Sequence, residues 1–452
     1  MMIWLRRAAI ALAVAATAIQ WANTRSATLI ANQNAAHPLI LATYPIYHAM
    51  AASLREGRIG QVDQAALERY SSLHDPAAIY ERLPRDARHE WVPYYTLDIG
   101  YSFIVEAARL AFPGLPDNHL RAIALQLVAD AAMVLFVFFV FSQWNVWLGL
   151  LGAFLYSSQY AFAMLASFAY YYFWDIPLTF VVLGSIVLSC RRPSQATLWL
   201  TMAGAALGCG VWIRGSWWPL SLFLVVAIAA LSTTLRKKLL VPMAVFAVLA
   251  APQVLRSSLA RGQLTFSTRA VWHVAMVGLG YYPNPYGLEL HDEVVFKITK
   301  EKYGVQFRSE DYYAHDQAAR KEFLSIWGKD PGFVIRSFWG RLKASVRGQT
   351  EASVPSFLYV PNVGYRLACL AGFVGMILRG EDKRLMALLS AGVYVIYVVL
   401  TSAFFYVGLA YSNVSEVTLF VLFVGGIEAG CYAVRRLVEC DEDSGVPGWR
   451  MA

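Results

Sequence analysis

Long apolar stretches alternate with short polar connections along most of this chain. A helix needs roughly 20 mostly apolar residues to cross a bilayer. Stretches that approach or exceed this length are 122–142, 146–166, 174–190, 196–213, 216–234, 239–255, 361–378, 385–405 and 412–434, and a shorter apolar run occupies 8–23. The pattern predicts an all-α polytopic membrane protein with about ten transmembrane helices.

The first apolar run allows two interpretations. Arg6 and Arg7 precede a short alanine-rich stretch, an arrangement found both in cleaved signal peptides and in uncleaved anchors. We favour the anchor, and either interpretation sends the following segment across the membrane.

Composition agrees with a membrane protein, and charge gives an orientation. Of the 452 residues 58% are hydrophobic and 15% charged, and the mean hydropathy is +0.46, well above a soluble average. Cytoplasmic loops are enriched in Lys and Arg. Short connections on one side carry Arg6, Arg7, Arg191, Arg192, Arg236, Lys237, Lys238, Arg379, Lys383, Arg384, Arg435 and Arg436, whereas those on the other side carry only Arg214. This asymmetry predicts that both termini are cytoplasmic, so the net charge of +8 gives no indication of nucleic-acid binding.

This topology divides the chain into six parts. We expect a first transmembrane helix at 1–23, an extracytoplasmic segment at 24–121, helices two to seven at 122–255, a second extracytoplasmic module at 256–360, helices eight to ten at 361–434 and a cytoplasmic tail at 435–452. All five cysteines fall in spans or on the cytoplasmic side, so neither outer segment is expected to hold a disulfide.

The two outer segments carry helical patterns. Apolar residues recur at helical spacing in 44–58 and in 98–111, which predicts two surface helices separated by a polar excursion at 60–90. In the second segment, 309–328 and 331–347 are predicted helices. Arg341 and Lys343 alternate with Phe338 and Trp339 in the latter, a combination that suits either lipid headgroups or a solvated helix face.

Ionisable residues at the outer ends of the spans are the main candidates for chemistry. Asp175 opens the fourth predicted span and Arg214 closes the fifth. Charges at membrane depth are costly, so they usually face a cavity or a partner. The alternatives are a mutual salt bridge or headgroup snorkelling. Asp98 has the alternative role of a helix cap. The outer acids leave a divalent metal possible, but no ligand cluster argues for one.

Several motifs together resemble the GT-C superfamily of integral-membrane glycosyltransferases. They are DNHLRAIALQLVADAAMVLF at the second span, WDIPLTF at an outer turn, AGAALGCGVWIRGSWWPL at the fifth span, and LRSSLARGQLTFSTRAVWHVAMVGLG with FLSIWGKDPGFVIRSFWGRLK in the second outer segment. The resemblance is to the family 39-like bacterial enzymes related to protein mannosyltransferases and to the aminoarabinose transferase of lipid A. It covers most of the chain.

The resemblance implies a polyprenyl-phosphate-linked sugar donor, an extracytoplasmic acceptor, a bacterial cytoplasmic membrane and transfer with inversion by an acidic base. It implies Asp175 as a catalytic acid, and Asp98 is our own candidate for a second. Implied substrate-binding residues, some of them for the lipid phosphate, are Arg214, Arg269, Arg341, Lys343, Arg121, and Tyr94 and Tyr95 next to the stretch that loosely matches the family's PPGYP.

One departure keeps other function classes open. The family carries an acidic pair just after the first span, where this chain has Thr43, Tyr44 and Pro45. Either Asp98 supplies the base or the chain does not catalyse the family reaction. A non-catalytic binder or transporter of lipid-linked sugars lacks support from paired broken spans. A scaffold subunit of an envelope-polymer assembly is favoured by the missing acidic pair.

Overall fold

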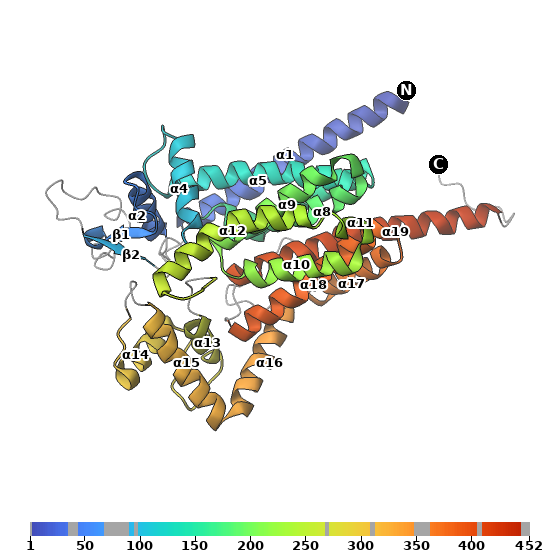
Figure 1. The fold of residues 1–452 in the computed structure, drawn as a ribbon. Coiled ribbons are helices and arrows are strands. Elements are labelled where there is room, and N and C mark those ends of the chain that lie inside the picture. The colour runs from blue at the N-terminus through green and yellow to red at the C-terminus, as the bar shows by residue number, and fades with distance from the viewer. Residues whose placement is uncertain are drawn as a thin grey trace.

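The protein is a bundle of long helices, with shorter helices and two strands at one end (Figure 1). The computed structural model describes residues 2–34, 44–66, 90–94, 98–266, 271–307, 312–347, 362–404 and 409–443. Within these residues, strands form only one two-stranded antiparallel sheet. The predicted class, an all-α polytopic membrane protein, is confirmed.

The bundle is built from long helices joined by short connections. These helices are α1 (Met2–Asn34), α5 (His119–Ser142), α6 (Val146–Ser158), α7 (Tyr160–Ala166), α8 (Asp175–Arg191), α9 (Ala196–Ile213), α10 (Trp217–Leu231), α12 (Leu240–Arg261), α17 (Asn362–Ile377), α18 (Glu381–Phe404) and α19 (Leu409–Asp443). Short elements link them: η3 (Tyr171–Trp174), η4 (Pro193–Gln195) and α11 (Thr233–Arg236). Side chains fix several boundaries, as where Asn118 caps α5 by accepting a hydrogen bond from the Leu120 amide at 2.9 Å.

The number of spans differs from the prediction. By length and composition, six of the described helices can cross a membrane, or seven if the bent pair α6 and α7, which meet at 61°, counts as one span. Helices α10 and α17 are apolar but shorter. The predicted count of about ten is therefore not confirmed. Helix α1 continues to Asn34, so residues 24–34, expected in the outer segment, belong to a helix.

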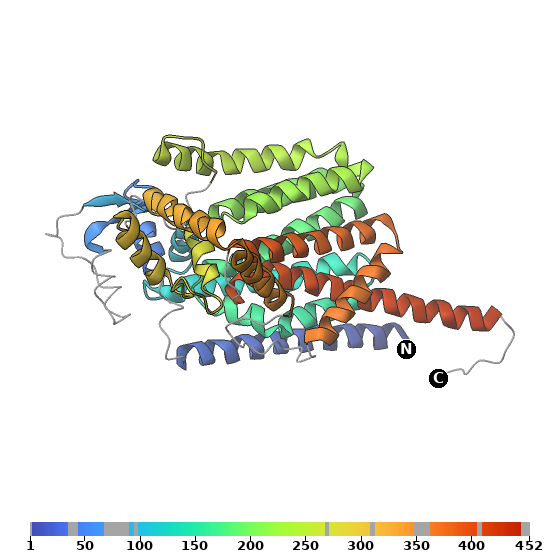
Figure 2. The ribbon, with the colours of Figure 1, turned by 90° about the horizontal axis from the view of Figure 1, so that it is seen from below.

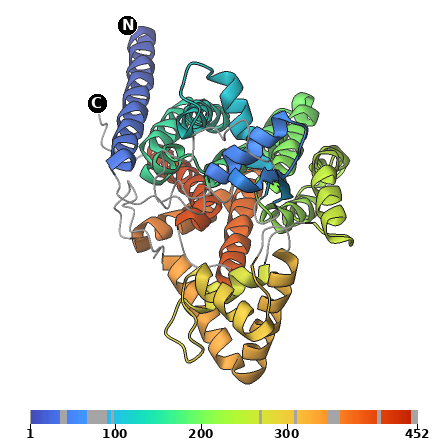
Figure 3. The ribbon, with the colours of Figure 1, turned by 90° about the vertical axis from the view of Figure 1, so that its left-hand side faces the viewer.

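Two groups of elements lie at one end of the bundle, opposite the start of α1 and the end of α19 (Figure 1). We call this the outer end, following the predicted orientation. The first group is α2 (Tyr44–Arg55), β1 (Gln61–Asp63), β2 (Trp91–Pro93) and α4 (Gly100–Ala111). The second, the outer module, is α13 (Val271–Leu279), α14 (Asp292–Tyr303), α15 (Tyr312–Lys329) and α16 (Pro331–Arg347). Seen from the outer end, the module lies to one side of the bundle (Figure 3). The helices expected in both outer segments are confirmed, although the helix expected from Ser309 begins at Tyr312, after undescribed residues.

Helix α8 occupies the middle of the bundle. Of its most apolar window 78% is buried, compared with 22% for the corresponding window of α12. Helices α1 and α12 lie at opposite edges (Figure 2). The first residue of α8, Asp175, therefore lies inside the protein, away from lipid.

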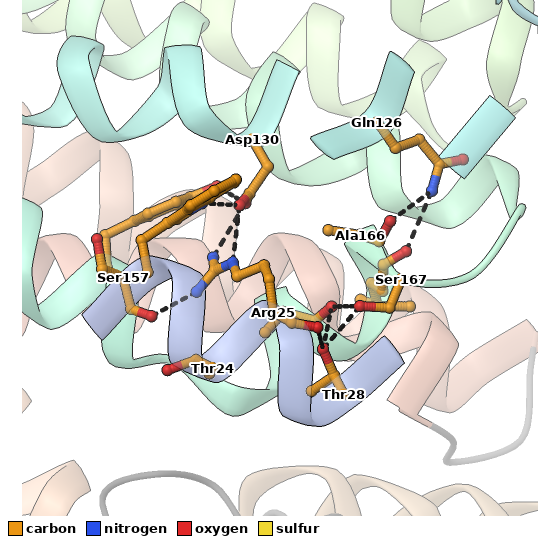
Figure 4. A network of polar contacts seen from close by, with 12 residues as sticks. Thr24, Arg25, Thr28, Gln126, Asp130, Ser157, Ala166 and Ser167 are labelled. Carbon is orange, nitrogen blue, oxygen red and sulfur yellow. Dashed lines mark hydrogen bonds and ion pairs between the residues drawn. The ribbon is translucent and has the colours of Figure 1, made fainter. Parts of the chain in front are cut away.

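A buried ion pair fastens α1 to the bundle (Figure 4). Arg25 donates to Asp130 of α5 from Nε at 2.8 Å and from Nη2 at 3.1 Å, and it also donates to the carbonyl of Ser157. Trp21 and Tyr156 donate to the same carboxylate at 2.6 and 2.8 Å. Helix α1 thus supplies two of these donors, and the contacts hold it against α5.

We expect the Asp130→Ala variant to unfold at a lower temperature in detergent. The change leaves Arg25 buried without its counter-ion, which costs about 3–5 kcal/mol. Replacing both partners, as Arg25→Met with Asp130→Leu, should recover most of the loss because no charge remains buried. Thermal unfolding of the wild type and of both variants measures this, and a double variant no more stable than Asp130→Ala would contradict the account.

The outer module has its own apolar core and a buried histidine chain. The core is formed by Met276, Leu279, Val295, Ile326 and neighbouring side chains. His315 is fully buried and lies 2.9 Å from Nδ1 of His273 and 3.1 Å from the hydroxyl of Thr299. Burial, and then the proximity of His273, lowers the pKa of His315 to about 4.

The stability of the outer module is therefore expected to fall in mild acid. In the unfolded chain a histidine binds a proton below its ordinary pKa of about 6.5, whereas folded His315 stays neutral down to about pH 4. Between these values the unfolded state binds more protons, so stability decreases as pH falls. Thermal unfolding at pH 7.5 and pH 5 should show the decrease, and His315→Gln should reduce it. The exposed His291, changed to Gln, is the matched control; an equal effect of both changes would refute the assignment.

Candidate active site

The candidate site is built around the turn between α9 and α10. Helix α9 ends at Ile213, and Arg214 has extended backbone angles. Gly215 and Ser216 then lead into α10. This places the Arg214 side chain and the Trp217 indole near the start of α8.

Arg214 is buried among polar and aromatic groups. Its Nη1 donates to Oδ2 of Asp175 at 2.6 Å and to the hydroxyl of Tyr397 on α18 at 2.7 Å. Its guanidinium carbon lies 4.2 Å from the centre of the Tyr172 ring. With 1% exposure, this cation meets a carboxylate, a hydroxyl and a π face away from bulk water.

Asp175 joins Arg214 to Trp217. The second carboxylate oxygen, Oδ1, accepts a hydrogen bond from the Trp217 indole at 2.8 Å. The residue is completely buried. Both carboxylate oxygens therefore have strong donors, an arrangement that fixes the geometry of the turn. The salt bridge between Asp175 and Arg214, which the sequence left open as an alternative to a substrate-facing role, is present.

Asp98 lies on the other side of the same turn. Its Oδ2 accepts a hydrogen bond from the Gly215 amide at 3.2 Å, and the residue is completely buried. It does not cap α4, where Ile99 holds the cap position without a side-chain bond. Gly100 allows this approach, since a Cβ there would lie 2.6 Å from the Trp212 backbone. The structure thus brings Asp98, Asp175 and Arg214, distant in sequence, to one turn.

Tyrosine rings connect this turn to the first outer group. Tyr171 and Tyr172 have ring centres 4.2 Å apart, and Tyr171 lies 5.6 Å from Tyr47 of α2. Tyr47 in turn meets Tyr101 of α4 edge to face at 5.0 Å. Asn413 of α19 donates to the carbonyl of Tyr172 at 3.0 Å. Closely packed aromatic rings with hydroxyl groups suit a ligand that has both apolar and polar faces.

The other predicted site residues have different surroundings. Arg121 binds Asp117 at 2.9 Å and backbone carbonyls of the preceding loop. The backbone carbonyl of Tyr94 accepts a hydrogen bond from Arg256 at 3.1 Å.

The basic residues of α16 are not equivalent. Arg341 is 1% exposed and lies near Tyr282, and burial lowers its pKa to about 10. Lys343 is exposed. Tyr95, Arg269 and the Thr43 position lie outside the described residues. None of the described contacts of Arg121, Arg341 or Lys343 reaches Asp98, Asp175 or Arg214.

Two solved structures are similar to this chain. Both are ArnT from Cupriavidus metallidurans, of the superfamily that the sequence resembles. The apo structure is 15% identical over 75% of this chain and 68% of that one, with a TM-score of 0.32. The structure bound to undecaprenyl phosphate is 15% identical over 85% and 72%, with a TM-score of 0.33.

Sequence matching gives no further relatives. No family model matches the chain, and no curated protein matches it.

Sequence reasoning missed several contributors to the buried polar contacts. Asp130 is the sole acid within its predicted span, a signal that could have identified it. Tyr397 and Asn413 lie in apolar stretches in which a single hydroxyl or amide gives no distinct signal. Within the described parts of the chain, no three His, Cys, Asp or Glu side chains are grouped to hold a metal ion.

Proposed function

We propose that this protein is a membrane glycosyltransferase that moves a sugar from a polyprenyl-phosphate-linked donor to an extracytoplasmic acceptor. The observation that supports it best is the meeting of Asp98, Asp175 and Arg214 at one turn at the outer end of the bundle. The motifs that resemble GT-C enzymes supply the reaction class. The proposal places the protein in a bacterial cytoplasmic membrane with both termini in the cytoplasm.

The two acids have different proposed roles. Asp175 is committed to Arg214 and Trp217, so it acts as a positioning residue that holds the turn in shape. Asp98 is the proposed base: it accepts the proton of the acceptor hydroxyl or amine as that group attacks the anomeric carbon. The bond to the lipid phosphate breaks, and the phosphate leaves with the electron pair. A well-placed carboxylate contributes about 100- to 10,000-fold to such a step.

The surroundings of the turn fit a donor with an apolar tail and a polar head. Apolar spans border the turn on the membrane side, and the tyrosines of η3, α2 and α4 lie around it. The acceptor then approaches from the outer end, where the first outer group and the outer module lie (Figure 1).

The deciding experiment incubates purified full-length protein with a radiolabelled polyprenyl-phosphate sugar and envelope extract. Label transferred to an acceptor supports the enzyme. Saturable binding without transfer would show that the protein is a binder of lipid-linked sugars and not an enzyme. Both acids are completely buried, so the assay measures binding as well as transfer. Absence of both binding and transfer would leave the scaffold interpretation.

A further inference from the structure

A second arginine lies at the outer end, at the seam where α16, α17 and α18 meet. Arg366 lies near the start of α17. One Nη donates to the hydroxyl of Tyr394 on α18, and the other lies 3.5 Å from the carbonyl of Ser345 on α16. Ser345 also receives a hydrogen bond from Ser402 of α18 at 3.3 Å. Three helices thus hold the guanidinium in one position.

Among the described residues, Arg366 differs from Arg25 and Arg214 in having no carboxylate in direct contact. Arg25 and Arg214 each have a carboxylate within 3 Å. Within the described parts of the chain, no carboxylate oxygen lies within 4 Å of Arg366, and its buried Nε has no hydrogen-bond acceptor. Glu416 of α19 interacts with Arg366 electrostatically but without such a contact. A half-buried cation with an unused donor favours an anionic ligand.

The seam lies beside the candidate site. Tyr394 and Tyr397 are three residues apart on α18 and therefore project from the same face, with Cβ atoms about 5–6 Å apart. Tyr397 accepts from Arg214 and Tyr394 from Arg366, so the two guanidinium groups approach neighbouring tyrosines. Because Arg214 is neutralised by Asp175, Arg366 is the member of this pair that remains for an incoming anion.

Depth and exposure indicate that the anion belongs to a lipid. Arg366 lies near the start of α17, and its partner Tyr394 lies in the middle of α18, a helix long and apolar enough to cross a membrane. The neighbouring Leu367 and Leu370 are more than half exposed on the bundle surface, as expected of a face against acyl chains. A phosphate held in the membrane plane reaches this position laterally, with its tail along α17.

We propose that Arg366, oriented by Tyr394 and Ser345, binds the phosphate of a polyprenyl phosphate at the seam of α16, α17 and α18. This rests on the proposed function, since it assigns the phosphate of that donor to Arg366. Arg214 then keeps its place with Asp175 throughout the reaction.

The test measures binding of three probes to full-length protein in nanodiscs: a polyprenyl monophosphate, the corresponding polyprenol, and inorganic phosphate. Wild-type protein should bind the lipid phosphate at least about tenfold more tightly than the alcohol, since charge-assisted hydrogen bonds to phosphate are worth this much. Arg366→Gln should remove this preference, and Arg366→Lys should retain part of it. Tyr394→Phe, which keeps the ring, should weaken binding of the phosphate several-fold without affecting the alcohol.

The matched control is Arg379→Gln, because Arg379 binds Glu428 near the opposite end of α17 and should leave all three affinities unchanged. Unchanged binding in folded Arg366→Gln would overturn the assignment; if Asp98→Asn still abolishes transfer, the proposed function survives. If the wild-type protein binds no lipid phosphate, both the assignment of Arg366 and the proposed function are wrong. Equal competition by inorganic phosphate would show that the seam takes a soluble anion and would overturn the lipid assignment.

Discussion

Asp98→Asn is expected to lower sugar transfer by about 100- to 10,000-fold, the contribution of a well-placed general base. The amide keeps the volume and a hydrogen-bond acceptor for the Gly215 amide, but it cannot take up the acceptor proton. Initial rates with a saturating lipid-linked sugar measure the loss. Binding of the donor should change little, since Asp98 has no proposed contact with the phosphate.

Two comparisons make this prediction specific. Asp117→Asn is the control, because Asp117 is a partly exposed acid of the same outer end that pairs with Arg121 and His48; it should retain near wild-type rates. Asp98→Glu should recover part of the activity, since it restores a carboxylate. Full activity of Asp98→Asn would rule out Asp98 as the base and reopen the question of whether the protein catalyses transfer.

Asp175→Ala is expected to destabilise the protein by about 3–5 kcal/mol, because it leaves the buried Arg214 without its carboxylate. Thermal or denaturant unfolding in detergent measures the change. Transfer activity should fall as well, since the α9–α10 turn loses both bonds that hold it to α8.

A double variant separates stability from function. Asp175→Leu with Arg214→Met removes both charges and should recover most of the stability while remaining inactive. Glu301→Ala, which breaks an exposed pair with Lys297, should cost less than about 1 kcal/mol and serves as the control. If Asp175→Ala costs no more than this control, Asp175 does not hold the turn.

The sequence was informative where a residue differed sharply from its neighbours. Asp175 and Arg214 are isolated charges beside apolar runs, so both position and pairing could be inferred from the cost of burying charge. The apolar periodicity likewise predicted α2 and α4. Composition and hydropathy were sufficient to predict the class of the fold. The thickness of the bilayer sets the length of a membrane-spanning apolar run, so such runs can be recognised in the sequence.

Contacts between distant segments could not be predicted from the sequence. Asp98 could have capped α4 or accepted a hydrogen bond from the Gly215 amide. Which of the two occurs depends on how α4 packs against α9, and this close approach requires Gly100. Arg25 was assigned to an outer segment because hydropathy falls after residue 23, although α1 continues beyond it. The partners of Arg341 and Arg366 depend on the packing of α16 against α17 and α18, for which local patterns give no signal.

The bond between Arg25 and Asp130 also bears on how the protein is made. The two residues are separated by 105 positions, so a ribosome completes the first helix long before it reaches the acid. During that interval a cation near the membrane interior has no carboxylate to neutralise it, and such a charge disfavours stable insertion of an isolated helix. The nascent first helix is therefore expected to stay near the translocon or at the bilayer surface, and to settle against its neighbours only after α5 and α6 have been synthesised.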